Sequence, residues 1–165
     1  MTPWITRSPE ERGLLNPGFC ALLLYKAAQG HAADSDAGLS FETSFLVLAI
    51  VLDRATRELL PRAFTTSLAV WLEENALARS RIADRSRTLT PFTKEALTFA
   101  GLHGLLLLKA GIIRPNLDWK KKVTATINAS SDEVRTCAKR AEFVGRWFSK
   151  TGSAATVMAL IGVRP

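Results

Sequence analysis

The chain contains one uninterrupted stretch of eight apolar residues, at positions 45–52. Such a stretch has no polar face to turn toward water, so the element that it forms must be covered on most sides. It is far shorter than the roughly 20 residues that a helix needs to cross a bilayer. We therefore expect a helix at the centre of a folded core, with a buried strand as the alternative, and no membrane anchor.

Helix start and stop signals divide the chain before this stretch into two helices and a loop. Residues 8–11 have a capping-box pattern with proline at the first helical position. Asn16 followed by Pro17 starts a second helix, which Gly30 is expected to stop. The small and polar residues 30–39 then predict a loop.

After the apolar stretch, the same signals predict four more short helices. The first is expected at residues 53–60, ended by a proline, and the second after the Thr-Thr-Ser run that starts at Thr65. An arginine-rich helix follows at residues 76–87. Thr90 and Pro91 have the sequence of an N-cap and a first helical residue, so a separate helix is predicted from there.

The clearest β signal lies at residues 105–115, where two short apolar stretches flank Gly111 and predict a hairpin. A helix that leads into a small hairpin is the arrangement of a winged-helix domain. Residues 117–126 alternate loosely and predict a further strand or an irregular arm. The predicted fold class is therefore mainly α with a small β hairpin (α+β), in a single winged-helix-like domain over residues 1–165.

The end of the chain predicts one long helix and a docked tail. Ser131 is the expected N-cap of a helix at residues 131–150, and Gly152 is its expected C′ residue. The apolar residues 154–165 are expected to dock on the core as a strand or as a short helix with an extended end.

Charge is distributed unevenly along the chain. Residues 1–52 carry a net charge of −2 and residues 53–108 a net charge of +2, whereas residues 109–165, with eleven basic and four acidic groups, carry +7. A positive field can attract a polyanion or an acidic partner surface, but alone it indicates no sequence-specific recognition.

Two basic segments are candidates for contact with nucleic acid. In the first, three consecutive lysines could neutralise phosphates while the neighbouring tryptophan stacks on a base or packs against the backbone. The alternative is a solvated turn with a buried indole. The arginine-rich helix is a second candidate, the alternative being a solvated helix face. The nucleic-acid-binding candidates are Trp119, Lys120, Lys121, Lys122, Arg81 and Arg85.

Another set of residues is a candidate for contact with a partner protein. Trp147 falls near the edge of the apolar stripe of helix 131–150, beside Arg146, the alternative being a core position together with Phe148. Aromatic and arginine side chains at such positions suit protein interfaces. With the apolar end of the tail, the predicted partner-binding residues are Arg146, Trp147, Val163 and Arg164.

The sequence supplies no complete catalytic or metal-binding pattern. His31 and His103 lie outside recognised motifs, and two cysteines 117 positions apart with two separated histidines lack zinc-ligand spacing. No glycine-rich loop ends in Gly-Lys, so neither nucleotide binding nor any other cofactor is expected. Cys20 and Cys137 are expected to be buried thiols in a reducing cytoplasm. We therefore expect a chain that is not an enzyme.

Four blocks of sequence, in this order, resemble one known group of proteins. They are LLNPGFCALLLYKA at residues 14–27, LLPR at 59–62 with TSLAVWLEEN at 66–75, AEFVGRWF at 141–148, and GVRP at 162–165. The chain resembles the small middle component of bacterial three-component ABC systems, a group that includes the Lamassu anti-phage and anti-plasmid systems. The resemblance covers nearly the whole chain.

The resemblance implies a subunit that bridges an SMC-like ABC ATPase and an effector-bearing subunit, often a nuclease. It implies double-stranded DNA as a partner of the complex and a cytoplasmic, accessory role comparable to that of kleisin and winged-helix subunits of SMC complexes. The hairpin and the basic residues leave a second interpretation open, a free-standing winged-helix DNA-binding regulator. A third, a small hydrolase that uses Cys20, is supported by nothing beyond the presence of the thiol.

Overall fold

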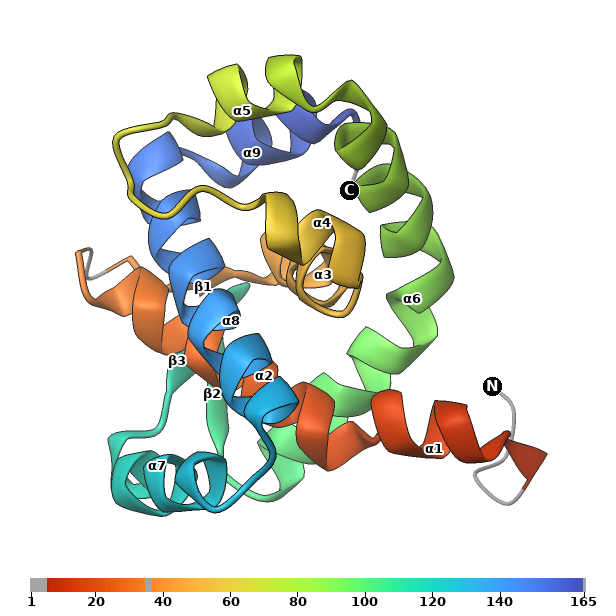
Figure 1. Cartoon of the computed structure of the whole chain (residues 1–165). Coiled ribbons are helices and arrows are strands. Elements are labelled where there is room, and N and C mark those ends of the chain that lie inside the picture. The colour runs from red at the N-terminus through yellow and green to blue at the C-terminus, as the bar shows by residue number, and fades with distance from the viewer. Residues whose placement is uncertain (1–5, 35–36, 165) are drawn as a thin grey trace.

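The computed structural model describes residues 6–34 and 37–164, and the chain is mainly helical with a small antiparallel sheet. The helices wrap around α3, and the sheet and α7 lie together at one end of the molecule (Figure 1). The elements are α1 (Pro9–Leu14), α2 (Pro17–Ala32), β1 (Leu39–Ser40), α3 (Phe41–Val51), α4 (Arg54–Leu59), α5 (Leu68–Glu74), α6 (Ala76–Leu102), β2 (Leu106–Lys109), β3 (Ile112–Pro115), η2 (Leu117–Trp119), α7 (Lys120–Asn128), α8 (Asp132–Thr151) and α9 (Ala154–Ile161).

The eight-residue apolar stretch forms most of α3, so the prediction of a central helix is confirmed and the alternative of a strand is wrong. The Ser40 side chain caps this helix by accepting a hydrogen bond from the backbone N–H of Thr43 at 3.1 Å. Every residue from Leu46 to Val51 is buried. Helices α2, α4, α6, α8 and α9 all contact α3, which explains why it has no polar face.

Helices α2 and α8 make the most extensive contact between two helices, and two glycines allow it. A Cβ atom at Gly145 of α8 would lie 2.6 Å from the carbonyl carbon of Ala27 in α2, and one at Gly30 would lie 2.8 Å from the carbonyl carbon of Glu142. The sequence suggested that Gly30 ends α2, and this prediction is wrong. The helix continues to Ala32, and Gly30 lets the two backbones approach.

The arginine-rich helix and the helix expected after Pro91 are one element, α6. The predicted break is wrong because Thr90 and Pro91 lie inside a continuous helix. Proline lacks the N–H that would bond to the carbonyl four residues earlier, and such a site bends a helix. Helix α6 indeed curves around one side of the molecule (Figure 1). The side chain of Thr90 donates a hydrogen bond to the carbonyl of Ser86 at 2.8 Å in this region.

The predicted hairpin is confirmed as β2 and β3, joined by a two-residue turn at Ala110 and Gly111. Both turn residues have positive φ, 50° and 75°, as a type I′ turn requires. The loop expected at residues 30–39 contributes a third strand, β1, which pairs with β3 to give the order β1-β3-β2. A two-residue strand has too little alternation to be recognised in the sequence.

The strand or irregular arm expected at residues 117–126 is wrong. This segment forms the 3-10 turn η2 and helix α7, in which Val123 is the buried residue. By contrast, the long C-terminal helix is found as α8, capped by Ser131 and followed by Gly152. The tail forms the short helix α9, the second of the two expected forms, and α9 contacts α3, α5, α6 and α8.

Candidate functional site

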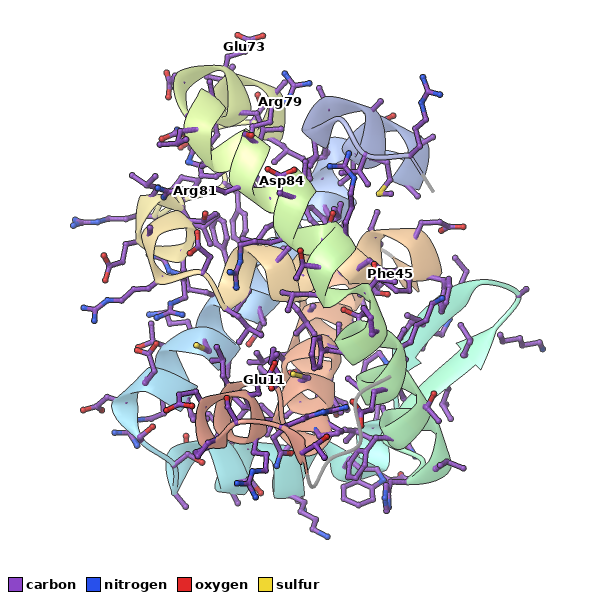
Figure 2. The ribbon with its side chains drawn as sticks, turned by 90° about the vertical axis from the view of Figure 1, so that its right-hand side faces the viewer. Glu11, Phe45, Glu73, Arg79, Arg81 and Asp84 are labelled. Carbon is purple, nitrogen blue, oxygen red and sulfur yellow. The ribbon has the colours of Figure 1, made fainter. Side chains whose placement is uncertain are left out.

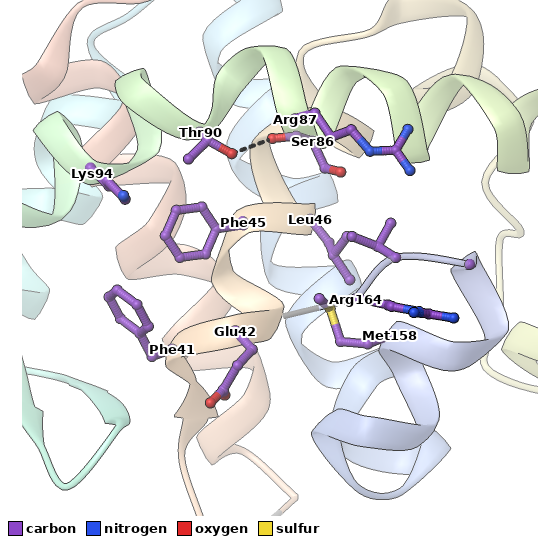
Figure 3. A pocket seen from close by; sticks show the side chains of 12 residues that line it. Phe41, Glu42, Phe45, Leu46, Ser86, Arg87, Thr90, Lys94, Met158 and Arg164 are labelled. Atoms are coloured by element: carbon purple, nitrogen blue, oxygen red, sulfur yellow. Dashed lines mark hydrogen bonds between the residues drawn. The ribbon is translucent and has the colours of Figure 1, made fainter. Parts of the chain in front are cut away.

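A groove of about 640 Å³ lies between α3, α6 and the end of α9 (Figure 3). Its volume is within the range of ligand-binding clefts. The apolar part of its lining consists of Phe41, Phe45, Leu46, Met158 and Val163. The charged part consists of Glu42, Arg87, Lys94 and Arg164.

Two phenylalanines of α3 supply the aromatic part of the groove. Phe41 and Phe45 are four positions apart, so they project from the same face of the helix. Their rings meet edge to face, with centroids 5.2 Å apart and an interplanar angle of 80°. Phe41 also packs against the hydrophobic core, whereas Phe45 is half-buried without belonging to the core or to the residues packed on it. Phe45 therefore contributes mainly to the groove.

The wall opposite the phenylalanines comes from the middle of α6. Arg87 and Lys94 are exposed, with Thr90 between them (Figure 3). Arg87 makes an exposed ion pair with Asp84 at 3.1 Å, which contributes little to stability. Lys94 makes no ion pair with any residue that the structure describes. Its ammonium group is therefore available to an anionic ligand.

The third wall is the end of the chain, which turns sharply after α9. Gly162 has a left-handed conformation, with φ of 87°, and the N–H of Val163 donates to the carbonyl of Met158 at 3.0 Å. This turn satisfies the last carbonyls of α9 and directs Val163 and Arg164 into the lining of the groove. Two of the four residues predicted to bind a partner thus lie together at this site.

The other two predicted partner-binding residues do not lie in the groove. Trp147 is only 1% exposed, and its Nε1 donates a hydrogen bond to the carbonyl of Thr66 at 3.0 Å. Its ring meets the ring of Trp71 edge to face, with centroids 5.5 Å apart. Of the two positions expected for Trp147, the structure shows the core position, because Thr66 and Trp71 lie against the indole.

Arg146 remains partly exposed but is held by the chain itself. Its guanidinium forms two hydrogen bonds with the carboxylate of Asp34, at 2.6 and 3.0 Å, and lies 4.9 Å above the ring centre of Phe64. The hydrogen bond from Arg146 lowers the pKa of Asp34. Arg146 thus ties α8 to the segment after α2.

The predicted nucleic-acid-binding residues of the C-terminal third lie around the start of α7. Lys120, Lys121 and Lys122 are all exposed, and Trp119 is half-buried against the core. The ammonium group of Lys122 lies 4.6 Å above the ring centre of Trp119. Because successive residues of a helix diverge by about 100°, the three lysines do not point in one direction.

The remaining two candidates, Arg81 and Arg85, lie near the start of α4. Burial raises the pKa of Asp53, the N-cap of α4, but hydrogen bonds from Thr56 and the charges of Arg85 and Arg81 outweigh burial and lower it overall. Arg81 lies on the α4 side of α6, and Phe45 lies on the other side (Figure 2). These two arginines are therefore separate from the groove.

Cys20 and possible metal ligands are the groups to examine for catalysis in the described parts of the chain. Burial, together with the charge of Glu95, raises the pKa of the Cys20 thiol to about 12, so this thiol is protonated and a poor nucleophile at neutral pH. No group of three or more His, Cys, Asp or Glu residues in those parts is placed to hold a metal ion.

Among the helices that the structure describes, none is both long enough and apolar enough to span a membrane.

Three groove residues, Phe41, Phe45 and Lys94, were not predicted from the sequence as site residues, and Arg87 was considered only as part of the arginine-rich helix. The one available signal was the spacing of the two phenylalanines, one helical turn apart at the start of the apolar stretch. Because the helix was expected to be covered on most sides, that spacing predicted that both phenylalanines belong to the core and not to a binding surface. The two cations became visible as groove residues only when residues 76–102 were found to form one helix.

The chain was compared with protein families, with curated proteins and with solved structures. A family model described as "ABC-three component (ABC-3C) system Middle Component 3" matches residues 4–165. Searches of curated proteins and of solved structures gave no match.

Proposed function

Because the chain belongs to the family of ABC-three component system middle component 3 proteins, we propose that it is a non-catalytic adaptor subunit of such a system. In this proposal, it bridges an SMC-like ABC ATPase and an effector-bearing subunit, such as a nuclease, in a cytoplasmic anti-phage or anti-plasmid defence complex of the Lamassu type. The family match over residues 4–165 is the observation that carries the proposal.

Two features of the structure support an adaptor. The groove between α3, α6 and α9 combines an apolar lining with exposed cations, a composition that suits the binding of a partner segment. Both cysteines, Cys20 and Cys137, are buried, and burial raises the pKa of each thiol. An adaptor requires binding surface and no activated group.

Purification of the chain alone and together with the products of its neighbouring genes tests the proposal. The tagged chain is expected to copurify with the ATPase and with the effector-bearing subunit, and the isolated chain is expected to hydrolyse neither ATP nor nucleic acid. Metal-dependent nuclease activity that follows the isolated chain and disappears on substitution of one carboxylate would contradict the proposal.

A free-standing winged-helix DNA-binding regulator is the alternative, and the hairpin directly after α6 favours it. The same preparations separate the two functions. A regulator is expected to bind its own promoter DNA with sequence specificity when neither the ATPase nor the effector subunit is present. An adaptor is expected to associate with those subunits without such specificity.

For the complex, we also propose a sequence-independent contact between the start of α7 and the DNA backbone. Each phosphate contact contributes roughly −0.9 to the slope of log affinity against log salt concentration. Since the helical geometry lets about two of the three lysines face one strand, replacing Lys120, Lys121 and Lys122 with alanine should flatten this slope by roughly two units.

The measurement is DNA binding by the assembled complex, titrated at several salt concentrations. The control is Lys139→Ala, which removes one exposed cation of α8 that lies outside α7. If the slope is the same for the triple variant and the control, the three lysines do not contact DNA phosphates.

A further inference from the structure

We propose that the groove between α3, α6 and α9 binds an acidic amphipathic segment of another component of the complex. The inference rests on the proposed adaptor function and adds the position and the chemistry of one interface. In it, a large apolar side chain of the partner segment sits on Phe41 and Phe45, and carboxylates beside that side chain meet Arg87, Lys94 and Arg164.

Phe41 packs against the hydrophobic core, whereas Phe45 contributes its ring mainly to the groove. Phe45 lies in α3, the most buried helix, yet it is half-buried and does not pack on the core. It faces a cavity of about 640 Å³ that also contains side-chain surface of Met158 and Val163. The exposed part of these half-buried rings gains free energy when an apolar side chain covers it, and aromatic residues commonly anchor protein interfaces.

The charges around the groove specify the sign of the segment. Arg87 and Lys94 come from α6 and Arg164 is the last described residue, and among the described lining residues these cations stand against the carboxylate of Glu42 on α3. Asp84 pairs with Arg87 at 3.1 Å from the preceding turn of α6 and partly offsets its charge. Neither Lys94 nor Arg164 has an ion-pair partner in the described part of the chain. The lining therefore attracts anions on balance.

The combination of surfaces favours a polypeptide over a nucleic acid. DNA-binding surfaces track a regular line of phosphates, whereas here the three cations surround a concave apolar centre. A peptide segment with alternating apolar and acidic residues satisfies both parts at once. DNA is accordingly an outcome of the test that would overturn the proposal.

Site-specific photo-crosslinking in the assembled complex identifies what occupies the groove. A benzophenone amino acid is placed at Phe45, and crosslinked peptides are mapped by mass spectrometry. The expected crosslink joins Phe45 to a segment of another component in which apolar residues alternate with aspartate or glutamate. A probe at Leu102, which is 82% exposed near the end of α6 and outside the groove, is the matched control and should not capture this segment.

Two point substitutions test the apolar and the charged parts separately. Phe45→Ala should weaken the affinity of the chain for the component captured by the crosslink about thirtyfold, the effect of removing an interface hot spot. Its control is Phe99→Ala, since Phe99 is a partly exposed phenylalanine on α6 outside the groove. Lys94→Glu should weaken binding more at low salt than at high salt, and Lys139→Glu should leave binding unchanged.

The outcomes separate this inference from the proposed function. If the chain fails to copurify with any other component, the adaptor function itself is wrong. If the complex assembles normally but Phe45 crosslinks only to DNA, to this chain or to a basic segment, the adaptor function stands and the inference is overturned. The same conclusion holds if Phe45→Ala and Phe99→Ala bind the other components equally well and both variants keep the melting temperature of the wild type.

Discussion

Replacing Gly145 with alanine is expected to lower the free energy of unfolding by about 3 kcal/mol, at the upper end of the cost of an overpacked core. A Cβ at this position would lie 2.6 Å from the carbonyl carbon of Ala27, and real Cβ atoms do not approach other atoms this closely. The obstacle is the backbone of α2, which cannot rotate away as a side chain could. The two helices must therefore separate, and contacts along their whole interface are lost.

Urea denaturation followed by circular dichroism measures this effect on the isolated chain. For a chain of this length, about 3 kcal/mol corresponds to a decrease in melting temperature of roughly 6–12 °C. Gly101→Ala is the matched control, because Gly101 lies in α6 and a Cβ added there would meet no other atom within 4 Å. Alanine there should leave stability unchanged or raise it by up to about 1 kcal/mol. Equal stabilities of the two variants would contradict the close crossing of α2 and α8.

Local signals in the sequence predicted the elements whose boundaries are set by neighbouring residues. The caps at Ser8, Asn16 and Ser131 each accept a backbone hydrogen bond at the start of a helix, as expected. The hairpin was also predicted, because its glycine-containing turn is local.

The errors arose where long-range packing decides between two local possibilities. Pro91 carries the signal of a helix start, but α6 packs against both α2 and α3, which favours one continuous helix through this position. Gly30 carries the signal of a helix stop, but its role depends on Glu142, which is 112 positions away in the chain. Neither neighbour can be identified from the residues around the glycine or the proline.

The candidate site was predictable only in part, for a related reason. The end of the tail could be recognised because Val163 and Arg164 follow an apolar segment at the end of the sequence. Phe45 and Lys94 lie 49 positions apart, and the groove between them exists because α3 and α6 pack side by side. A concave surface built from three separate helices leaves no periodic pattern in any one of them.

Trp147→Ala is expected to produce the other large effect, a loss of about 3–5 kcal/mol of stability. The indole is 1% exposed, it contacts the rings of Trp71 and Phe143, and its Nε1 donates to the carbonyl of Thr66. Its removal leaves a large cavity between α5 and α8 and an unpaired carbonyl. Trp147→Phe keeps an aromatic ring but not the donor, so it should cost less, roughly 1–3 kcal/mol.

Comparison with Phe45→Ala distinguishes a core aromatic from an interface aromatic in the same chain. Thermal unfolding of the isolated chain should show a much larger loss of stability for Trp147→Ala than for Phe45→Ala, because Trp147 is fully buried whereas Phe45 is half-buried and loses mainly its edge-to-face contact with Phe41. Affinity for the partner component, measured with protein that is folded at the assay temperature, should fall more for Phe45→Ala than for Trp147→Ala. If Trp147→Ala instead melts like the wild type and abolishes assembly, the indole is an interface residue, as its position at the edge of the α8 stripe suggests, and α8 rather than the groove contacts the partner.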